Sequence, residues 1–271
     1  MAVIDKSNDR VVIVSVESGE RMATVGSMGM GAGEFIFPSG IAFSDAGELY
    51  VCSIPTDNAV QVFDRQGRYV RGFGKWGDGE GQFDTPSGLC FTAGGNLVVI
   101  DSETHRVQIF REDGTFVRAF GSHGSGDGEF ESLTDVCSGA DGSIAILDGE
   151  AGRVLVFDGE GVFLRSFGYM GPDGGLDTLA NFFTLAAGGD GEIIIASQFR
   201  RKDVQILSPE GELLQTVSTE SLVDMFTGDT IQDRASRLLM VGGIATVDGV
   251  MYVSMCSDGE PECKATVAML S

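Results

Sequence analysis

Basic residues and long apolar runs are scarce in this chain of 271 residues. Only 18 residues are Lys or Arg against 40 Asp or Glu, which gives a formal net charge of −22. Because phosphate binding needs a basic surface, this balance argues against a nucleic-acid partner. No apolar run reaches the roughly 18 residues that cross a membrane. Residues 1–20 also lack the basic start and apolar core of a signal peptide, so we expect neither a membrane span nor a leader.

Cysteine is also scarce and forms no recognisable framework. The 5 cysteines are odd in number and include no Cys-x-x-Cys pair, which excludes a small disulfide scaffold and a finger-type zinc site. Cys256 and Cys263 flank a short loop, and both a disulfide and two reduced thiols stay open there. We expect a cytoplasmic protein, with an extracellular location as the alternative.

Glycine, in contrast, is abundant. It occupies 40 positions, about twice its usual share of roughly 7%. Proline occupies only 6 positions and 42% of residues are hydrophobic, which excludes intrinsic disorder and a collagen-like fibre. The composition therefore indicates a soluble, acidic, globular chain with many turns.

A repeat of 47 residues organises most of the chain. Phe63, Phe110 and Phe157 are separated by 47 residues each, and a second set of three phenylalanines has the same spacing. The repeated pattern is nearly complete in residues 81–121, good in 33–74 and 128–168, and weak in 172–219.

Each repeat contains four short β-rich runs, separated by glycine-containing turns such as Asp45-Ala46-Gly47. Four strands in a repeat of about 40–50 residues are typical of a β-propeller blade. One twisted sheet cannot bury both of its faces alone, so the blades must stack around an axis. We predict an all-β protein with a six-bladed β-propeller of four-stranded blades, and five blades as the alternative.

The repeat also predicts one domain that spans residues 1–271. Segments Val3–Lys6 and Arg10–Val14 match the middle of a repeat, so the first blade lacks its first strand. The expected repeats are about 31–77, 78–124, 125–171 and 172–219, with partial terminal blades at 1–30 and 220–271.

The motifs of these repeats resemble the NHL-repeat β-propeller family, including the propeller domains of TRIM-NHL-like proteins. The resemblance rests on Gly-x-Phe, Pro-Ser-Gly-Leu and Arg-Val-Gln-Ile-Phe, which residues 81–121 contain in order. It implies a propeller with one face that docks proteins or RNA. The RNA-binding members present a basic face, so the charge of −22 argues against that use here.

An aspartate and an arginine recur five residues apart in three repeats. The pairs are Asp5 with Arg10, Asp101 with Arg106 and Asp148 with Arg153. Binding sites usually lie on loops that break a repeat. We therefore interpret the pairs as structural bonds that fix the turn between the second and third strands, rather than as a ring of catalytic charges. Ser53 and Ala59 replace the pair in one repeat.

Signals of catalysis are weak. His105 and His123 are the only 2 histidines and fall on adjacent blades, which is too few for a three-histidine zinc site. No serine lies in a Gly-x-Ser-x-Gly motif, and the glycine-rich run Gly29–Gly33 lacks the lysine of a phosphate-binding loop. We expect no catalytic residues, no metal and no cofactor. The alternative is a metal-dependent propeller enzyme of lyase or lactonase type, with a site over the central channel.

The remaining candidate is an interaction face. Loops between blades and loops between second and third strands meet at one face of a propeller. Varied side chains at equivalent loop positions are how repeat scaffolds encode partner specificity. We expect a monomer that binds a protein or peptide partner there. The blade-joining loops carry Met28, Trp76, His123 and Met170 at equivalent positions, and the predicted site comprises Asp57, Asn58, Trp76, Glu103, His105, His123, Phe199, Arg200 and Arg201.

Overall fold

The secondary structure is almost entirely β, as the repeat predicts. The computed structural model describes residues 2–15, 20–54, 57–168, 182–197, 203–218, 239–247, 250–257 and 264–267. These residues contain 24 strands and one short 3-10 helix, η1 (Lys6–Asn8). Within this described part, no helix is long and apolar enough to cross a membrane.

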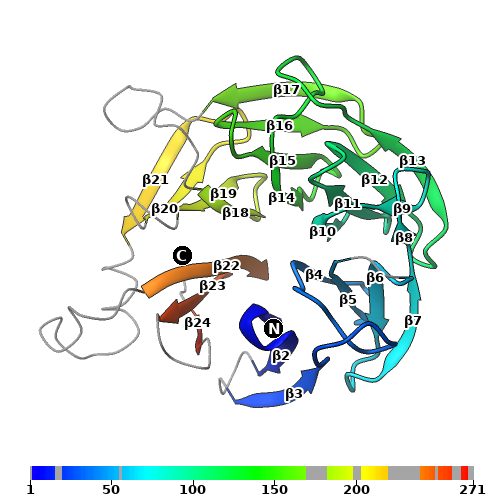
Figure 1. Cartoon of the computed structure of the whole chain (residues 1–271). Coiled ribbons are helices and arrows are strands. Elements are labelled where there is room, and N and C mark those ends of the chain that lie inside the picture. Colours follow the sequence, from blue (N-terminus) through cyan, green and yellow to red (C-terminus); the bar gives the residue numbers. More distant parts are fainter. Residues whose placement is uncertain are drawn as a thin grey trace, which may run out of the picture.

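Four antiparallel sheets of four strands each follow one another around a central opening (Figure 1). Their strands pair in chain order, each with the next along the chain. The first sheet contains β4 (Gly40–Phe43), β5 (Leu49–Cys52), β6 (Val60–Phe63) and β7 (Tyr69–Phe73). The second contains β10 (Pro86–Phe91), β11 (Leu97–Asp101), β12 (Arg106–Phe110) and β13 (Phe116–Phe120). The third and fourth contain β14 (Leu133–Ser138), β15 (Ile144–Asp148), β16 (Arg153–Phe157), β17 (Phe163–Gly168), β18 (Phe182–Ala187), β19 (Ile193–Ser197), β20 (Asp203–Leu207) and β21 (Leu213–Ser218).

Among the described residues the two terminal sheets have three strands each, so the prediction of four-stranded blades holds for the four sheets between them. The N-terminal sheet contains β1 (Ala2–Asp5), β2 (Arg10–Val14) and β3 (Arg21–Val25). Within the described residues it has no strand in the place of a blade's first strand, and the predicted partial blade at residues 1–30 stays a prediction. The C-terminal sheet contains β22 (Leu239–Val247), β23 (Val250–Ser257) and β24 (Lys264–Val267). A separate parallel pair joins β8 (Lys75–Trp76) to β9 (Gln82–Phe83).

The first strand of each blade lies next to the central opening, and the fourth lies at the rim (Figure 1). The inner strands approach each other closely. A Cβ atom on Gly40 of β4 would lie 2.9 Å from the Cα atom of Gly88 on β10. Between β14 and β18, Asp135 fills the corresponding gap and accepts hydrogen bonds from Leu185 N (2.8 Å) and Thr184 Oγ1 (2.9 Å).

The core is divided between the blades. One cluster combines Val60 and Tyr50 of the first four-stranded sheet with Val99 and Phe110 of the second. Such a cluster forms because both faces of a middle strand are covered by neighbouring blades. Strand β11 is accordingly buried at every position, and its side chains Leu97, Val98, Val99, Ile100 and Asp101 follow no polar–apolar alternation.

Candidate interaction face

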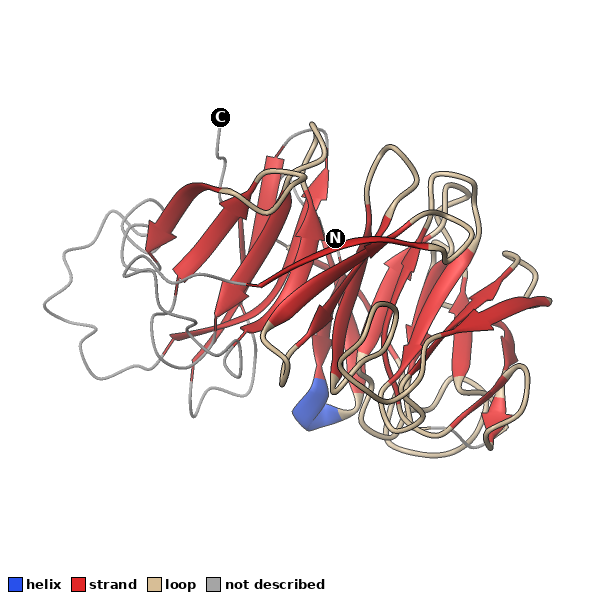
Figure 2. Ribbon diagram, turned by 90° about the horizontal axis from the view of Figure 1, so that it is seen from above, coloured by secondary structure: helices blue, strands red, loops and turns tan. Residues whose placement is uncertain are grey.

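Two sets of loops meet on one face of the propeller, which we call the loop face. The strands alternate in direction, so the loops that leave each second strand and each fourth strand emerge on the same side. The described loops of this face are 6–9, 53–54 with 57–59, 102–105 and 149–152 within blades, and 26–39, 74–85 and 121–132 between blades. The blue turn of η1 marks this side in Figure 2.

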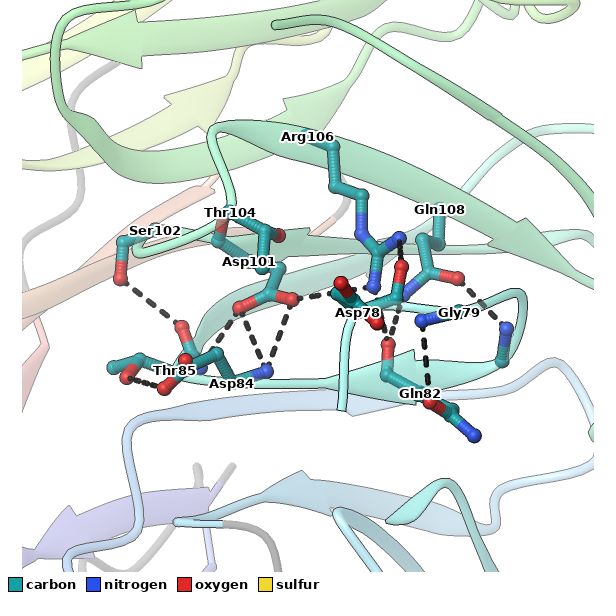
Figure 3. A network of polar contacts seen from close by, with 11 residues as sticks. Asp78, Gly79, Gln82, Asp84, Thr85, Asp101, Ser102, Thr104, Arg106 and Gln108 are labelled. Atoms are coloured by element: carbon teal, nitrogen blue, oxygen red, sulfur yellow. Dashed lines mark hydrogen bonds and ion pairs between the residues drawn. The ribbon is translucent and has the colours of Figure 1, made fainter. Parts of the chain in front are cut away.

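A buried polar network supports the loop face in the second four-stranded blade (Figure 3). Asp101, at the end of β11, is fully buried and accepts hydrogen bonds from Thr85 N (2.7 Å) and Asp84 N (3.1 Å). Arg106 Nη2 lies 3.8 Å from Asp101 Oδ2. The same guanidinium donates to the carbonyl oxygen of Gln82 at 2.8 Å and to that of Asp78. The pair thus fastens the blade-joining loop, in addition to the turn between second and third strands.

A buried glutamine completes the same network. Gln108 donates to the carbonyl oxygen of Gln82 at 2.6 Å and accepts from Gly81 N at 2.9 Å. In the preceding blade, Gln61 makes the corresponding bonds with Glu34 O (2.6 Å) and Gly33 N (2.7 Å). Because these bonds satisfy buried backbone groups, they make the loops rigid.

The next blade repeats the arrangement and supports the structural interpretation of the pairs. Asp148 is fully buried and accepts from Ser132 N at 2.8 Å. Arg153 Nε lies 3.2 Å from Asp148 Oδ2. The Arg153 side chain also donates to Ser125 O (2.7 Å) and Glu129 O (2.9 Å). Carboxylate and guanidinium are therefore committed to backbone groups, which leaves them unsuited to acid–base catalysis.

The first four-stranded blade departs from this pattern. Ser53 stands where β1, β11 and β15 end in a buried aspartate, just as Ser197 ends β19. Phe37 N, the counterpart of Thr85 N, therefore has no such carboxylate in its own blade. Asp9 of the preceding sheet supplies one instead, and its Oδ1 atom accepts from Phe37 N at 2.7 Å. The phenylalanine adopts a left-handed backbone conformation with φ of 50°.

The departure leaves two apolar side chains in solvent. Phe37 is 56% exposed and Ile54 is 43% exposed. Their segments lie side by side, because Ile54 N donates to Ile36 O at 3.0 Å. Neither Phe37 nor Ile54 is among the predicted site residues, although Ser53 in place of an aspartate is a sequence signal for this blade.

Equivalent exposed side chains occur in three blade-joining loops, as predicted. Met28, Trp76 and His123 each form a parallel bridge to a buried phenylalanine seven residues later, and these are Phe35, Phe83 and Phe130. The buried rings fix the loops while the bridged residues point outward. Met28 is 77% exposed, Trp76 is 68% exposed and His123 is also exposed. Met170, the fourth predicted member, lies outside the described residues.

The structure brings His105 and His123 into contact. Their ring centroids lie 4.6 Å apart in an edge-to-face arrangement, although one residue belongs to a turn within a blade and the other to the loop that leaves it. His105 has a left-handed φ of 50°, and its buried Nδ1 atom makes no hydrogen bond. Among the described residues, no group of three or more His, Cys, Asp or Glu is placed to hold a metal ion.

The other predicted site residues divide into two groups. Asp57 and Glu103 are exposed on the loop face, and Asn58 is half-buried beside Gly72, where an added Cβ would lie 2.5 Å from Asn58 Oδ1. Phe199, Arg200 and Arg201 lie outside the described residues. Cys263 does as well, so the Cys256–Cys263 alternative stays a prediction.

Several buried groups have raised pKa values. Burial raises the pKa of the Asp135 carboxyl to about 6, although hydrogen bonds from Leu185, Val136 and Thr184 act in the opposite direction. Burial likewise raises the pKa of the Cys52 thiol to about 11. The Cys52 thiol lies at the loop-face end of β5, 3.3 Å from Ser39 Oγ, and Asp135 lies near the start of the inner strand β14.

Exposed charge on the described loop face is mostly negative. The exposed carboxylates belong to Asp57, Asp78, Glu80, Glu103, Asp127, Glu131 and Glu150, and the exposed ammonium groups belong to Lys6 and Lys75. The arginines of this face, such as Arg106 and Arg153, are bonded to carbonyl and carboxylate oxygens beneath the surface. The loop face therefore combines exposed apolar side chains with an acidic surround.

Comparison with known families supports the fold. Residues 82–168, about a third of the chain, match the family model DUF5128, which is described as a 6-bladed beta-propeller. No curated protein matches this chain.

Solved structures with the same architecture include proteins of different function. A structure titled "Streptogramin B lyase structure" has a TM-score of 0.63 and 10% identity, covering 99% of this chain and 75% of that chain. A protein of unknown function from Bacteroides caccae has a TM-score of 0.62 and 14% identity, covering 93% of this chain and 81% of that one. A structure of U3-55K has a TM-score of 0.59 and 14% identity, covering 95% of this chain and 74% of that chain. None of these names refers to NHL repeats, so the finer resemblance stays a prediction. The chain is an all-β propeller, and its central repeats match a six-bladed family.

Proposed function

We propose that this propeller is a protein-interaction scaffold that binds a protein or peptide partner through its loop face. The observation that carries the proposal is the set of Met28, Trp76 and His123, which are exposed at one backbone position in successive blade-joining loops. Side chains of this size at regular positions on a rigid surface are suited to anchor a partner.

The backbone beneath these residues supports the same function. The networks around Asp101 and Asp148 satisfy the N–H groups of the blade-joining loops. A loop that is already ordered loses little conformational freedom when a partner binds. The large exposed side chains can therefore contribute to affinity with a small entropic cost.

A metal-dependent enzyme is a second candidate, because the His105 and His123 rings are in contact. The described residues do not fit a closed metal site, since no third ligand joins the two imidazoles. The proposal of a scaffold thus has the stronger support. Stoichiometric zinc or calcium that purified wild type retains and His123→Ala loses would favour the enzyme instead.

The test of the scaffold function is a peptide selection. Peptides selected from a random display library on the wild-type protein are measured against Trp76→Ala, with Val162→Ala as the control. Val162 is 57% exposed and lies in a turn between third and fourth strands, on the opposite face. We expect Trp76→Ala to weaken binding roughly tenfold or more, as for an aromatic anchor, and Val162→Ala to leave it unchanged. Equal binding by all three proteins would refute the scaffold proposal.

We also propose a cytoplasmic location for a monomeric protein. The described cysteines Cys52, Cys90 and Cys137 are free thiols, which suits a reducing compartment.

A further inference from the structure

We propose that the loop face recognises a basic peptide with an apolar anchor, and that Phe37 and Ile54 of the irregular blade hold this anchor. The inference rests on the proposed function, and it names the partner chemistry and the place where the partner binds.

The backbone of Phe37 is the first observation. Its φ of 50° lies in the left-handed region, which is unfavourable for a bulky residue. Its counterparts Thr85 and Ser132 do not have positive φ values. A strained backbone persists only when its surroundings hold it, and such strain is concentrated at binding and catalytic sites.

Asp9 stabilises the left-handed backbone conformation of Phe37. Its carboxylate accepts the hydrogen bond from Phe37 N at 2.7 Å, and Asp9 itself has a φ of 48°. The bond connects the turn of the N-terminal sheet to the loop that enters the next blade. Two left-handed residues and one charge-assisted bond thus keep a phenylalanine at a position where its ring is not buried.

Exposure of the ring is the second observation. Phe37 is 56% exposed, so burial within the chain does not compensate for the strain. The hydrogen bond from Ile54 N to Ile36 O places a second exposed apolar side chain beside it. Met28 and Met30 precede Phe37 in the same blade-joining loop and are also exposed. Methionine and aromatic side chains adapt readily to the shape of a bound apolar group.

Charge decides the nature of the partner. Asp57 belongs to the same irregular loop as Ile54, and Asp78 and Glu80 belong to the next blade-joining loop, with all three exposed. Lys6 and Lys75 are the exposed cations of the described loop face. The surround is therefore complementary to Lys or Arg side chains and repels acidic peptides and nucleic acids.

The direct test uses three labelled peptides of equal length. One alternates leucine with lysine, a second replaces leucine by serine, and a third replaces lysine by glutamate. Fluorescence anisotropy should show that the leucine–lysine peptide binds wild type at least about tenfold more tightly than either of the others. Raising sodium chloride from about 0.05 to 0.5 M should weaken this binding, because salt screens the exposed carboxylates.

Two matched variants locate the site. Phe37→Asn removes the ring and introduces a residue that tolerates the left-handed conformation, whereas Val162→Asn removes an equally exposed side chain from the opposite face. We expect Phe37→Asn to lose about fivefold or more in affinity for the leucine–lysine peptide and Val162→Asn to lose none. The thermal midpoint of Phe37→Asn should rise by about 2 °C, because backbone strain is relieved.

The outcomes separate this inference from the proposed function. If Phe37→Asn keeps full affinity, or if the glutamate peptide binds as well as the lysine peptide, the inference is wrong. The scaffold proposal still stands in that case if Trp76→Ala weakens binding of the library-selected peptides. If none of the variants affects any peptide, both proposals fail.

Discussion

The carboxylates of Asp101, Asp148 and Asp135 differ in what surrounds them. Asp101 and Asp148 each lie beside an arginine and accept backbone N–H groups, so their charge is well compensated. Asp135 also accepts hydrogen bonds, but among the described residues no cation forms an ion pair with it. Burial without an opposite charge favours the protonated form, which explains why its pKa is raised to about 6.

Asp135 should make stability depend on pH. Because its folded pKa of about 6 lies above the ordinary aspartate value of 3.8, the native state binds more protons than the unfolded state between these values. The contribution of this group to the free energy of unfolding therefore falls as pH rises from about 4 to 6. Asp135→Asn cannot ionise at this position. We therefore expect its free energy of unfolding to rise by about 2–3 kcal/mol relative to that of wild type over this pH interval.

Urea unfolding at several pH values measures this difference. Using the difference between variant and wild type cancels the contributions of the other carboxylates. Asp113→Asn, at an exposed turn position, serves as the control. Its free energy of unfolding relative to that of wild type should not change between about pH 4 and 6. A stability difference for Asp135→Asn that stays constant from about pH 4 to 7 would contradict the prediction.

At the scale of elements, turns of one blade interlock with the outer strand of the preceding blade. Gly161, in the turn between β16 and β17, has a φ of 79°, and an added Cβ would lie 2.4 Å from the Phe120 ring. Gly114 and Gly211 are placed in the same way against Phe73 and Phe167. These glycines therefore serve two needs, a left-handed backbone and room for an aromatic ring.

Alanine substitutions should separate these two needs. Gly142 has a φ of 82° with nothing within 4 Å of an added Cβ, so Gly142→Ala introduces backbone strain alone. We expect Gly142→Ala to cost about 1 kcal/mol of unfolding free energy. Gly161→Ala should cost a further 1–3 kcal/mol, roughly, because the Phe120 ring must move. Chemical denaturation measures both, and equal costs for the two variants would show that the blades do not interlock there.

The elements were largely predictable, and their irregularities were not. Strands β10–β13 fall where the 47-residue pattern places four β-rich runs, because alternation and turn glycines are local signals. Trp76 and His123 were also expected at equivalent positions, since equal spacing from a buried phenylalanine implies an equal place on the blade. Phe37 escaped notice because its position matches a polar residue in the other blades.

At the scale of the whole molecule, charge is the dominant feature. The formal net charge is −22, and an excess of like charge destabilises the compact state through repulsion. Salt screens this repulsion within a Debye length of about 10 Å at 0.1 M. The folded propeller should therefore be least stable at low ionic strength.

The thermal midpoint should rise with salt. We expect an increase of several degrees, roughly, between about 0.02 and 0.5 M sodium chloride in scanning calorimetry. A variant with fewer charges should respond less, and the exposed loop-face substitutions Asp57→Asn, Asp78→Asn, Glu80→Gln, Glu103→Gln and Asp127→Asn provide it. An equal response of variant and wild type would show that loop-face carboxylates do not contribute to the repulsion.

The amino-acid sequence by itself determined the propeller, because a 47-residue period of strands and glycine turns requires sheets that stack around an axis. It also determined that the first four-stranded blade lacks the buried aspartate, since Ser53 stands in its place. Only the tertiary structure decided what replaces it. A backbone N–H group takes whichever acceptor the fold brings within reach, and here Asp9, 28 residues away in another sheet, accepts the bond from Phe37. That bond between sheets leaves the phenylalanine ring exposed on the loop face.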